Sequence, residues 1–115
     1  MQVIRFATAD SYEPEPDWKR VCLCEEADIS LEHFVKPPRH ASPHHRHPSA
    51  QLLVVLEGEL TITNSDGDEV IVTKGDAVYI PGDEPHVVAN RLDRVTVGLD
   101  IFVPGRSFDF WRQRR

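Results

Sequence analysis

Short apolar segments recur along the whole chain, and none of them is long enough to read as a helix. No long window places apolar residues at i, i+3, i+4 and i+7, and nine prolines interrupt the sequence. Segments rich in β-branched and aromatic residues that end at Gly, Pro, Asn or Asp are typical of strands. About nine such segments in one small chain predict an all-β fold, either a sandwich or a barrel. They lie at residues 2–6, 19–24, 29–35, 51–57, 60–64, 69–73, 77–81, 86–90 and 94–103.

The chain has 115 residues, a length that supports one hydrophobic core but not two. We therefore expect a single domain over residues 1–115, with its core at about 29–104, N-terminal strands before the core and a C-terminal tail after it. Within the core, Asp66-Gly67 predicts a tight hairpin turn between two strands.

The segment at 51–57 is apolar on both faces of its expected strand. Leu53 and Val55 lie on one face, whereas Leu52, Val54 and Leu56 lie on the other. A strand that is buried on both sides in so small a domain needs a cover outside its own sheet. A terminal strand or a second subunit could provide it, and we expect a homodimer.

The overall charge excludes several kinds of partner. A formal net charge of −6 argues against nucleic acid, because phosphate binding needs a basic surface. The basic end "WRQRR" is expected to be a solvated terminus. No stretch approaches the roughly 20 apolar residues of a membrane span. The first residues, "MQVIRFATAD", lack a signal pattern, so we expect no membrane partner and a cytoplasmic location.

Four of the six histidines lie between residues 40 and 47. His45, His47 and Gln51 share one parity along the chain, so an unbroken strand would point them to one face. If His86 lies on a facing strand, the three imidazoles converge beside Gln51. This set suits a divalent transition metal. The alternative is a solvated histidine-rich loop without metal. His40 and His44 lie upstream or have the wrong parity, and we expect them to be exposed loop residues.

The same residues fit two spaced motifs. The first has the pattern HxH, a short spacer, an acidic residue and, six residues later, glycine; the second has glycine, PxG, histidine and asparagine. Here the first motif reads His45, His47, Gln51 and Gly58, and the second reads Gly75, Pro81, His86 and Asn90. The sequence thus resembles the cupin superfamily, specifically the small single-domain cupins.

This resemblance implies a small β-barrel, also called a double-stranded β-helix or jelly-roll. It also implies that His45, His47, Gln51 and His86 hold a divalent transition metal, namely Zn, Ni, Mn or Fe.

Three departures from the motifs bear on the site. Arg39 stands where the first motif has glycine, which suggests a different turn there. Asp83 replaces the glycine of PxG, with Gly82 one residue earlier. Gln51 replaces the glutamate, which raises the net charge of the site by one unit and removes a potential general base.

Glutamine at this position occurs in relatives that linearise unsaturated uronic sugars and in polyketide cyclases. The resemblance therefore favours a non-redox metalloenzyme of the lyase, isomerase or cyclase type. Its substrate would be a small oxygenated molecule with a carbonyl or carboxylate group, such as an unsaturated uronate. Two alternatives stay open: an iron- or nickel-dependent dioxygenase, and a small-molecule-binding protein without catalysis. Whether the chain is an enzyme is thus undecided by its sequence.

Two further residues are candidates for the substrate pocket. Tyr79 could donate a hydrogen bond to substrate, although tyrosines in small barrels also serve as packing residues. Asn90 matches the second motif and could instead orient a turn. Four aromatic residues near the C-terminus are expected to close one end of the barrel or to contact a subunit: Phe102, Phe108, Phe110 and Trp111.

Overall fold

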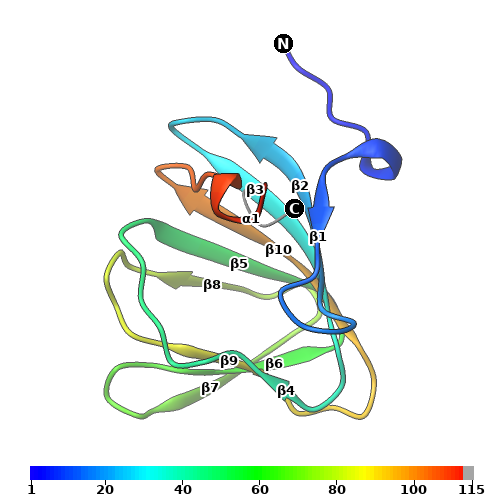
Figure 1. Cartoon of the computed structure of the whole chain (residues 1–115). Coiled ribbons are helices and arrows are strands. Elements are labelled where there is room, and N and C mark those ends of the chain that lie inside the picture. The colour runs from blue at the N-terminus through cyan, green and yellow to red at the C-terminus, as the bar shows by residue number, and fades with distance from the viewer. Residues whose placement is uncertain (113–115) are drawn as a thin grey trace.

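The computed structural model describes residues 1–112, so the last three residues of the basic tail lie outside the described part. Residues 1–112 form two antiparallel sheets that face each other (Figure 1). The predicted all-β jelly-roll is confirmed. The six-stranded sheet has the order β1-β2-β3-β10-β5-β8, and the four-stranded sheet has the order β4-β9-β6-β7. The elements are η1 (Phe6–Thr8), β1 (Ser11–Tyr12), β2 (Lys19–Glu25), β3 (Ser30–Lys36), β4 (His40–Ala41), β5 (Ala50–Glu57), β6 (Glu59–Thr63), β7 (Glu69–Thr73), β8 (Ala77–Ile80), β9 (Val87–Asn90), β10 (Thr96–Val103) and α1 (Asp109–Arg112).

The hydrophobic core lies between the inner faces of the two sheets. β5 contributes Leu53 and Val55, which are 1% and 0% exposed, because every second residue of a strand faces the same side. The remaining members come from both sheets, so the core joins them into one unit: Phe34, Leu60, Ile62, Val72, Ile80 and Val88.

The outer face of β5 has no cover within residues 1–112. Leu52 and Leu56 are 38% and 40% exposed, and Val103 of the neighbouring β10 is 51% exposed. Of the two covers expected from the sequence, a terminal strand is therefore ruled out for the described residues.

Arg39 and Asp83, which stand at glycine positions of the two motifs, both have positive φ angles. Arg39 and Asp83 have φ angles of 54° and 62°, in the left-handed region that favours glycine. The expectation of a different turn at Arg39 stays a prediction. Beside Asp83, Gly82 is needed for a close approach, because a Cβ at Gly82 would lie 2.3 Å from the carbonyl oxygen of Pro48.

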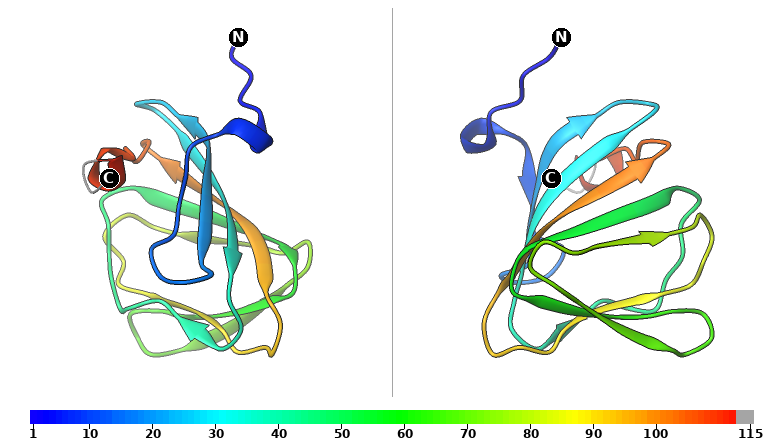
Figure 2. Two further views of the ribbon diagram at one scale, coloured as in Figure 1. Left: turned by 45° about the vertical axis from the view of Figure 1, so that its right-hand side comes forward. Right: turned by 180° about the vertical axis from the view of Figure 1, so that it is seen from behind.

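The N-terminal segment departs from the prediction. Residues 2–6 were expected to form a strand, but they pair with no other strand, and the segment projects away from the barrel (Figure 2). Val3 and Phe6 are 61% and 52% exposed, so the apolar pattern here reflects no burial against residues 1–112. Among residues 1–112 no helix has the length and apolar character needed to cross a bilayer.

Candidate metal centre and ligand pocket

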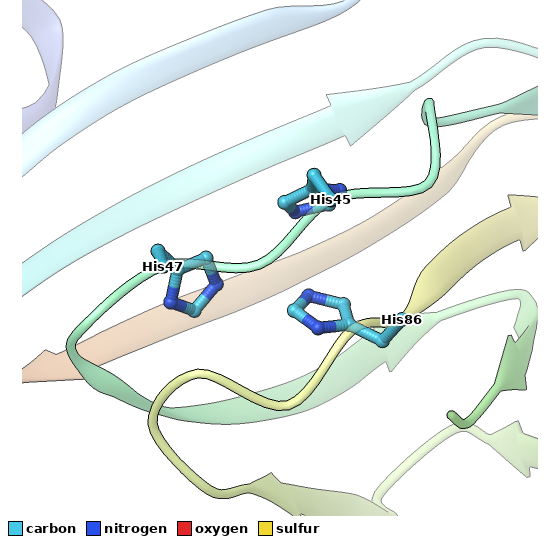
Figure 3. A group of neighbouring side chains, drawn as sticks. All are labelled: His45, His47 and His86. Carbon is cyan, nitrogen blue, oxygen red and sulfur yellow. The ribbon is translucent and has the colours of Figure 1, made fainter. Parts of the chain in front are cut away.

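Three histidines from two loops meet at one end of the barrel. His45 and His86 form an isolated antiparallel bridge, in which each backbone N–H donates to the other residue's carbonyl at 3.2 and 2.9 Å. Opposed residues of such a pair project to the same side. His47 follows two residues after His45, and the three rings point toward one another (Figure 3). One ring nitrogen of each histidine lies within 4.8 Å of the others. The structure thus brings the three predicted histidines together.

Backbone hydrogen bonds set the same orientation for all three rings. Each histidine places Nδ1 at hydrogen-bond distance from a carbonyl oxygen, which favours the tautomer that donates from Nδ1 and leaves a lone pair on Nε2. His86 Nε2 is buried and has no hydrogen-bond partner among the described residues. A buried nitrogen lone pair without a donor fits a metal ligand, so the three imidazoles could hold an ion. The Nδ1 atoms of His45, His47 and His86 lie 2.7, 2.8 and 2.8 Å from the carbonyl oxygens of Pro43, Ser49 and Glu84.

Burial also keeps two of these rings neutral. It lowers the pKa of His45 and of His86, and the neighbouring histidine charges lower it further, against the opposing effect of the Nδ1 hydrogen bonds. Neutral imidazole is the form that binds a metal, so the surroundings favour ligation near neutral pH.

Gln51 completes the group from the inner face of β5. Its side-chain Nε2 donates to Oδ1 of Asp100 at 2.6 Å, and this contact fixes which end of the amide faces the histidines. Oε1 therefore lies 3.1 Å from Nε2 of His47. With the lone pair of His47 on Nε2, two electron-pair donors face each other, an arrangement that a shared cation would stabilise. Asp100 is thus a positioning residue for Gln51.

A buried ionic network stands behind Gln51. Arg20 contacts Asp100 at 2.5 Å and Glu32 at 2.8 Å, and Arg106 contacts the second oxygen of Glu32 at 2.8 Å. The Tyr12 hydroxyl donates to Glu32 at 2.7 Å. Burial would raise the pKa of Glu32, but the two guanidinium groups outweigh burial and hold it below its usual value. Asp100 is therefore held from two sides, by Arg20 and by the Gln51 amide.

One pocket with a volume of about 280 Å³ is lined by two of the histidines, by Gln51 and by part of this network, namely His45, His47, Arg20, Asp100 and Arg106. That is near the lower end of the roughly 300–1,000 Å³ of drug-sized ligand sites, so the pocket suits a smaller molecule. The aromatic C-terminal residues contribute to its wall. Arg112 of α1 holds them there through ion pairs with Glu25 at 2.7 Å and Asp10 at 2.9 Å. The aromatic lining consists of Tyr12, Trp18, Phe34, Phe102, Phe110 and Trp111.

Tyr79 does not reach this pocket, which corrects the prediction from the sequence. It pairs with Leu52 on the outer face of the six-stranded sheet and is 64% exposed. Ile80, one residue later, takes the inward position.

Asn90 is buried, but it serves the backbone instead of lining the pocket. Its side-chain amide donates to the carbonyl oxygens of Pro37 and Arg94 at 3.0 and 2.9 Å, and its Oδ1 accepts from the backbone N–H of Leu92. It therefore orients a turn, which was the alternative considered for it.

The two other loop histidines stay outside the cluster. His44 is exposed, as predicted. His40 is partly buried, because it pairs with Glu15 and packs on Trp18 at a ring-centroid distance of 4.9 Å. The expectation of an exposed loop residue is wrong for His40.

The charged network is the part of the site that sequence reasoning missed. Arg20, Glu32 and Asp100 belong to three different strands, and Asp100 lies 80 residues after Arg20 in the sequence. Their sequence signal is weak, because only the observed burial shows that they lie at inward positions, where an unpaired charge is costly and a partner is therefore expected.

Comparison with known proteins agrees with this architecture. Residues 32–102 match the model of the cupin domain. Gentisate 1,2-dioxygenase from a Streptomyces species is 38% identical over 63 residues, which are 55% of this chain but only 18% of that protein. KdgF from Halomonas sp. has a TM-score of 0.83 at 20% identity, over 96% of this chain and 98% of KdgF. The polyketide cyclase RemF from Streptomyces resistomycificus has a TM-score of 0.76 at 23% identity, over 92% of this chain and 81% of RemF. With the family model covering more than half of its residues, the chain belongs to the cupin family.

Proposed function

We propose that this chain is a metal-dependent, non-redox enzyme of the lyase, isomerase or cyclase type. His45, His47, Gln51 and His86 would hold one divalent ion, which is Zn, Ni, Mn or Fe. The substrate would be a small oxygenated molecule with a carbonyl or carboxylate group, such as an unsaturated uronate. The observation that carries the proposal is the convergence of one ring nitrogen from each of the three histidines, with the Gln51 amide oxygen 3.1 Å from Nε2 of His47. His45, His47 and Gln51 also line one pocket.

A divalent metal bound there would polarise a carbonyl or enol oxygen of the substrate. Three neutral imidazoles and an amide do not compensate the charge of the ion, which favours an anionic oxygen ligand from the substrate. No change of metal oxidation state is needed for ring opening, isomerisation or cyclisation.

The chain's own residues would bind and shield the substrate. The aromatic wall formed by Trp18, Phe110 and Trp111 limits access of water to the pocket. Gln51 cannot take up a proton near neutral pH, and both oxygens of Asp100 already accept hydrogen bonds from Gln51 and Arg20. The pocket is therefore better suited to binding and orienting a polarised substrate than to strong base catalysis by a carboxylate.

The relative named gentisate 1,2-dioxygenase favours a second candidate, an iron- or nickel-dependent dioxygenase that uses the same ligands. The two candidates differ in a simple observable, since only the dioxygenase consumes oxygen. A binding protein without catalysis would show neither reaction.

We also propose that the protein is a homodimer that buries the outer face of β5. Leu52, Leu56 and Val103 form an apolar surface on adjacent strands that residues 1–112 leave open. A second copy of the chain would remove this surface from water, which is the main favourable contribution to protein association.

Turnover of a 4,5-unsaturated galacturonate tests the enzymatic proposal. Loss of the absorbance of its conjugated double bond, without oxygen uptake, is expected for the wild type and for His44→Ala. Activity should be absent in His47→Ala. Oxygen uptake with an aromatic or enolic substrate would instead identify the dioxygenase. If neither reaction occurs in metal-loaded protein, both enzymatic candidates are wrong and a binding protein remains.

A further inference from the structure

Lys36 is a buried cation that no carboxylate neutralises directly. It is the last residue of β3 and is 1% exposed. Its Nζ donates a hydrogen bond to Oγ of Ser42 at 2.9 Å and lies 4.2 Å from the centroid of the Trp18 ring. Within residues 1–112 no carboxylate oxygen comes within ion-pair distance of it, although buried lysines are rarely left unpaired.

The neighbouring charges pair with one another and leave Lys36 as an unpaired cation. Arg20 and Arg106 are matched by Glu32 and Asp100 through three direct ion pairs. These four charges sum to zero, so among these five charged residues Lys36 alone lacks a directly paired partner. Burial, together with the charge of Arg20, lowers the pKa of Lys36 to about 8, and its ammonium form still predominates at pH 7.

Lys36 lines the same pocket as His45 and His47. The backbone N–H of Ser42, the hydrogen-bond partner of Lys36, donates to the carbonyl of Val88 at 2.8 Å, whereas His45 pairs with His86. Val88 lies two residues after His86, which corresponds to about 7 Å along an extended chain. The backbone pairing beside the Lys36 partner Ser42 and the pairing of the histidines are therefore roughly one such step apart, a separation comparable to the span of a monosaccharide ring with its carboxylate.

We propose that Lys36 recognises the carboxylate of a small ligand whose other oxygens lie at the histidine end of the pocket. The contact of the ligand's other oxygens with the histidines rests on the proposed function, whereas the carboxylate site rests on the burial and contacts of Lys36. The ligand would replace water or free anions at Nζ and provide the missing negative charge. Ser42 and Trp18 hold the ammonium group in place for this contact, so Lys36 is a specificity residue and not a proton carrier.

Two probes that differ only in charge at one group test the proposal: galacturonate and its neutral methyl ester. Both lack the double bond of an unsaturated uronate, so binding can be measured by calorimetry without turnover. Metal-loaded wild-type protein should prefer the acid by tenfold or more. Lys36→Met should weaken binding of the acid by about 10- to 100-fold, the range for a hydrogen bond to a charged group, and leave the ester unchanged.

Lys19→Met is the matched control, because Lys19 is exposed on the neighbouring strand β2, and it should bind both probes like the wild type. Lys36→Gln keeps a hydrogen-bonding group near Ser42 and should show the same loss if Lys36→Met folds poorly. The proposal is overturned if the wild type binds acid and ester equally, binds neither, or if both Lys36 variants retain wild-type affinity for the acid. Metal content measured on the same samples separates the proposed metal site from the proposed carboxylate site. A wild type without metal contradicts the metal site. A wild type with bound metal but no preference for the acid contradicts only the role proposed for Lys36.

Discussion

Replacement of Lys36 by methionine should stabilise the free protein at pH 7. The fall in the pKa of Lys36 from 10.5 to about 8 corresponds to about 3 kcal/mol of unfavourable free energy for the charged form in the folded state. Methionine has a similar length and remains apolar. It loses the contact of the charge with Trp18 and the hydrogen bond to Ser42, each about 1 kcal/mol. The expected net gain is about 1 kcal/mol.

The gain in stability of Lys36→Met over the wild type should depend on pH in a defined direction. The folded chain releases the proton of Lys36 at lower pH than the unfolded chain does, so the unfolded state holds more protons between about pH 8 and 10.5. The contribution of Lys36 to the free energy of unfolding of the wild type therefore increases as the pH rises from about 8 to 10.5. Arg20 adds to the fall in pKa, whereas Asp100 and Glu15 oppose it. The advantage of the methionine variant should be full below pH 8 and should vanish within about one pH unit above that. Near pH 10 the wild type should be the more stable protein, because it has by then recovered most of the roughly 3 kcal/mol.

Urea unfolding followed by tryptophan fluorescence at pH 7 and pH 10 measures both quantities, with an unchanged m-value as the condition for comparing free energies. Lys19→Met is the control, and its free energy of unfolding should stay within about 0.5 kcal/mol of the wild type. The reasoning is refuted if Lys36→Met loses more than about 1 kcal/mol at pH 7 and the difference is the same at pH 10. The ammonium contacts would then outweigh the cost of burial.

Three other predictions concern the metal centre and the outer face. Asp100→Ala should weaken metal affinity by about 10- to 100-fold, because the Gln51 amide that Asp100 orients becomes free to turn. Glu69→Ala, at an exposed position, should leave metal affinity unchanged, and titration against a chelating dye measures the affinity of both variants. A divalent metal at 100 times its Kd should stabilise the protein by about 2.7 kcal/mol and raise its Tm by roughly 10 °C in a thermal melt, and EDTA or His47→Ala should abolish the rise. Leu52→Glu should convert the proposed dimer to a monomer, as measured by light scattering. Val70→Glu, at a 49% exposed position on the other sheet, should leave the dimer intact. An unchanged mass for Leu52→Glu would place the interface elsewhere.

The metal-ligand candidates were accessible from the sequence because their spacing is local. His45 and His47 lie two residues apart, and the second motif places His86 at a fixed distance from Gly75. Strand parity then correctly placed Gln51 with Leu53 and Val55 on the inner face of β5. These predictions need only the period of two along a strand.

The charged pocket could not be predicted in the same way, because β3 reverses the usual pattern. Its apolar residues Leu31 and Val35 face outward and are partly exposed, whereas Glu32 and Lys36 face inward and are buried. Hydrophobicity alone would assign the opposite orientation. The inward Glu32 is tolerated because Arg20 of β2 and Arg106 of the segment after β10 neutralise it, and such pairing depends on the tertiary fold and not on local sequence.

Metal analysis by mass spectrometry, on protein purified without an affinity tag or added metal, tests the metal centre most directly. His47→Ala removes one of the four proposed ligands, and His44→Ala removes an exposed neighbour as a control. The wild type and His44→Ala should each carry about one metal ion per chain, and His47→Ala should carry little or none. A wild type that contains no metal and takes up none on titration, or a His47→Ala variant that retains the full amount, would contradict the metal centre proposed here.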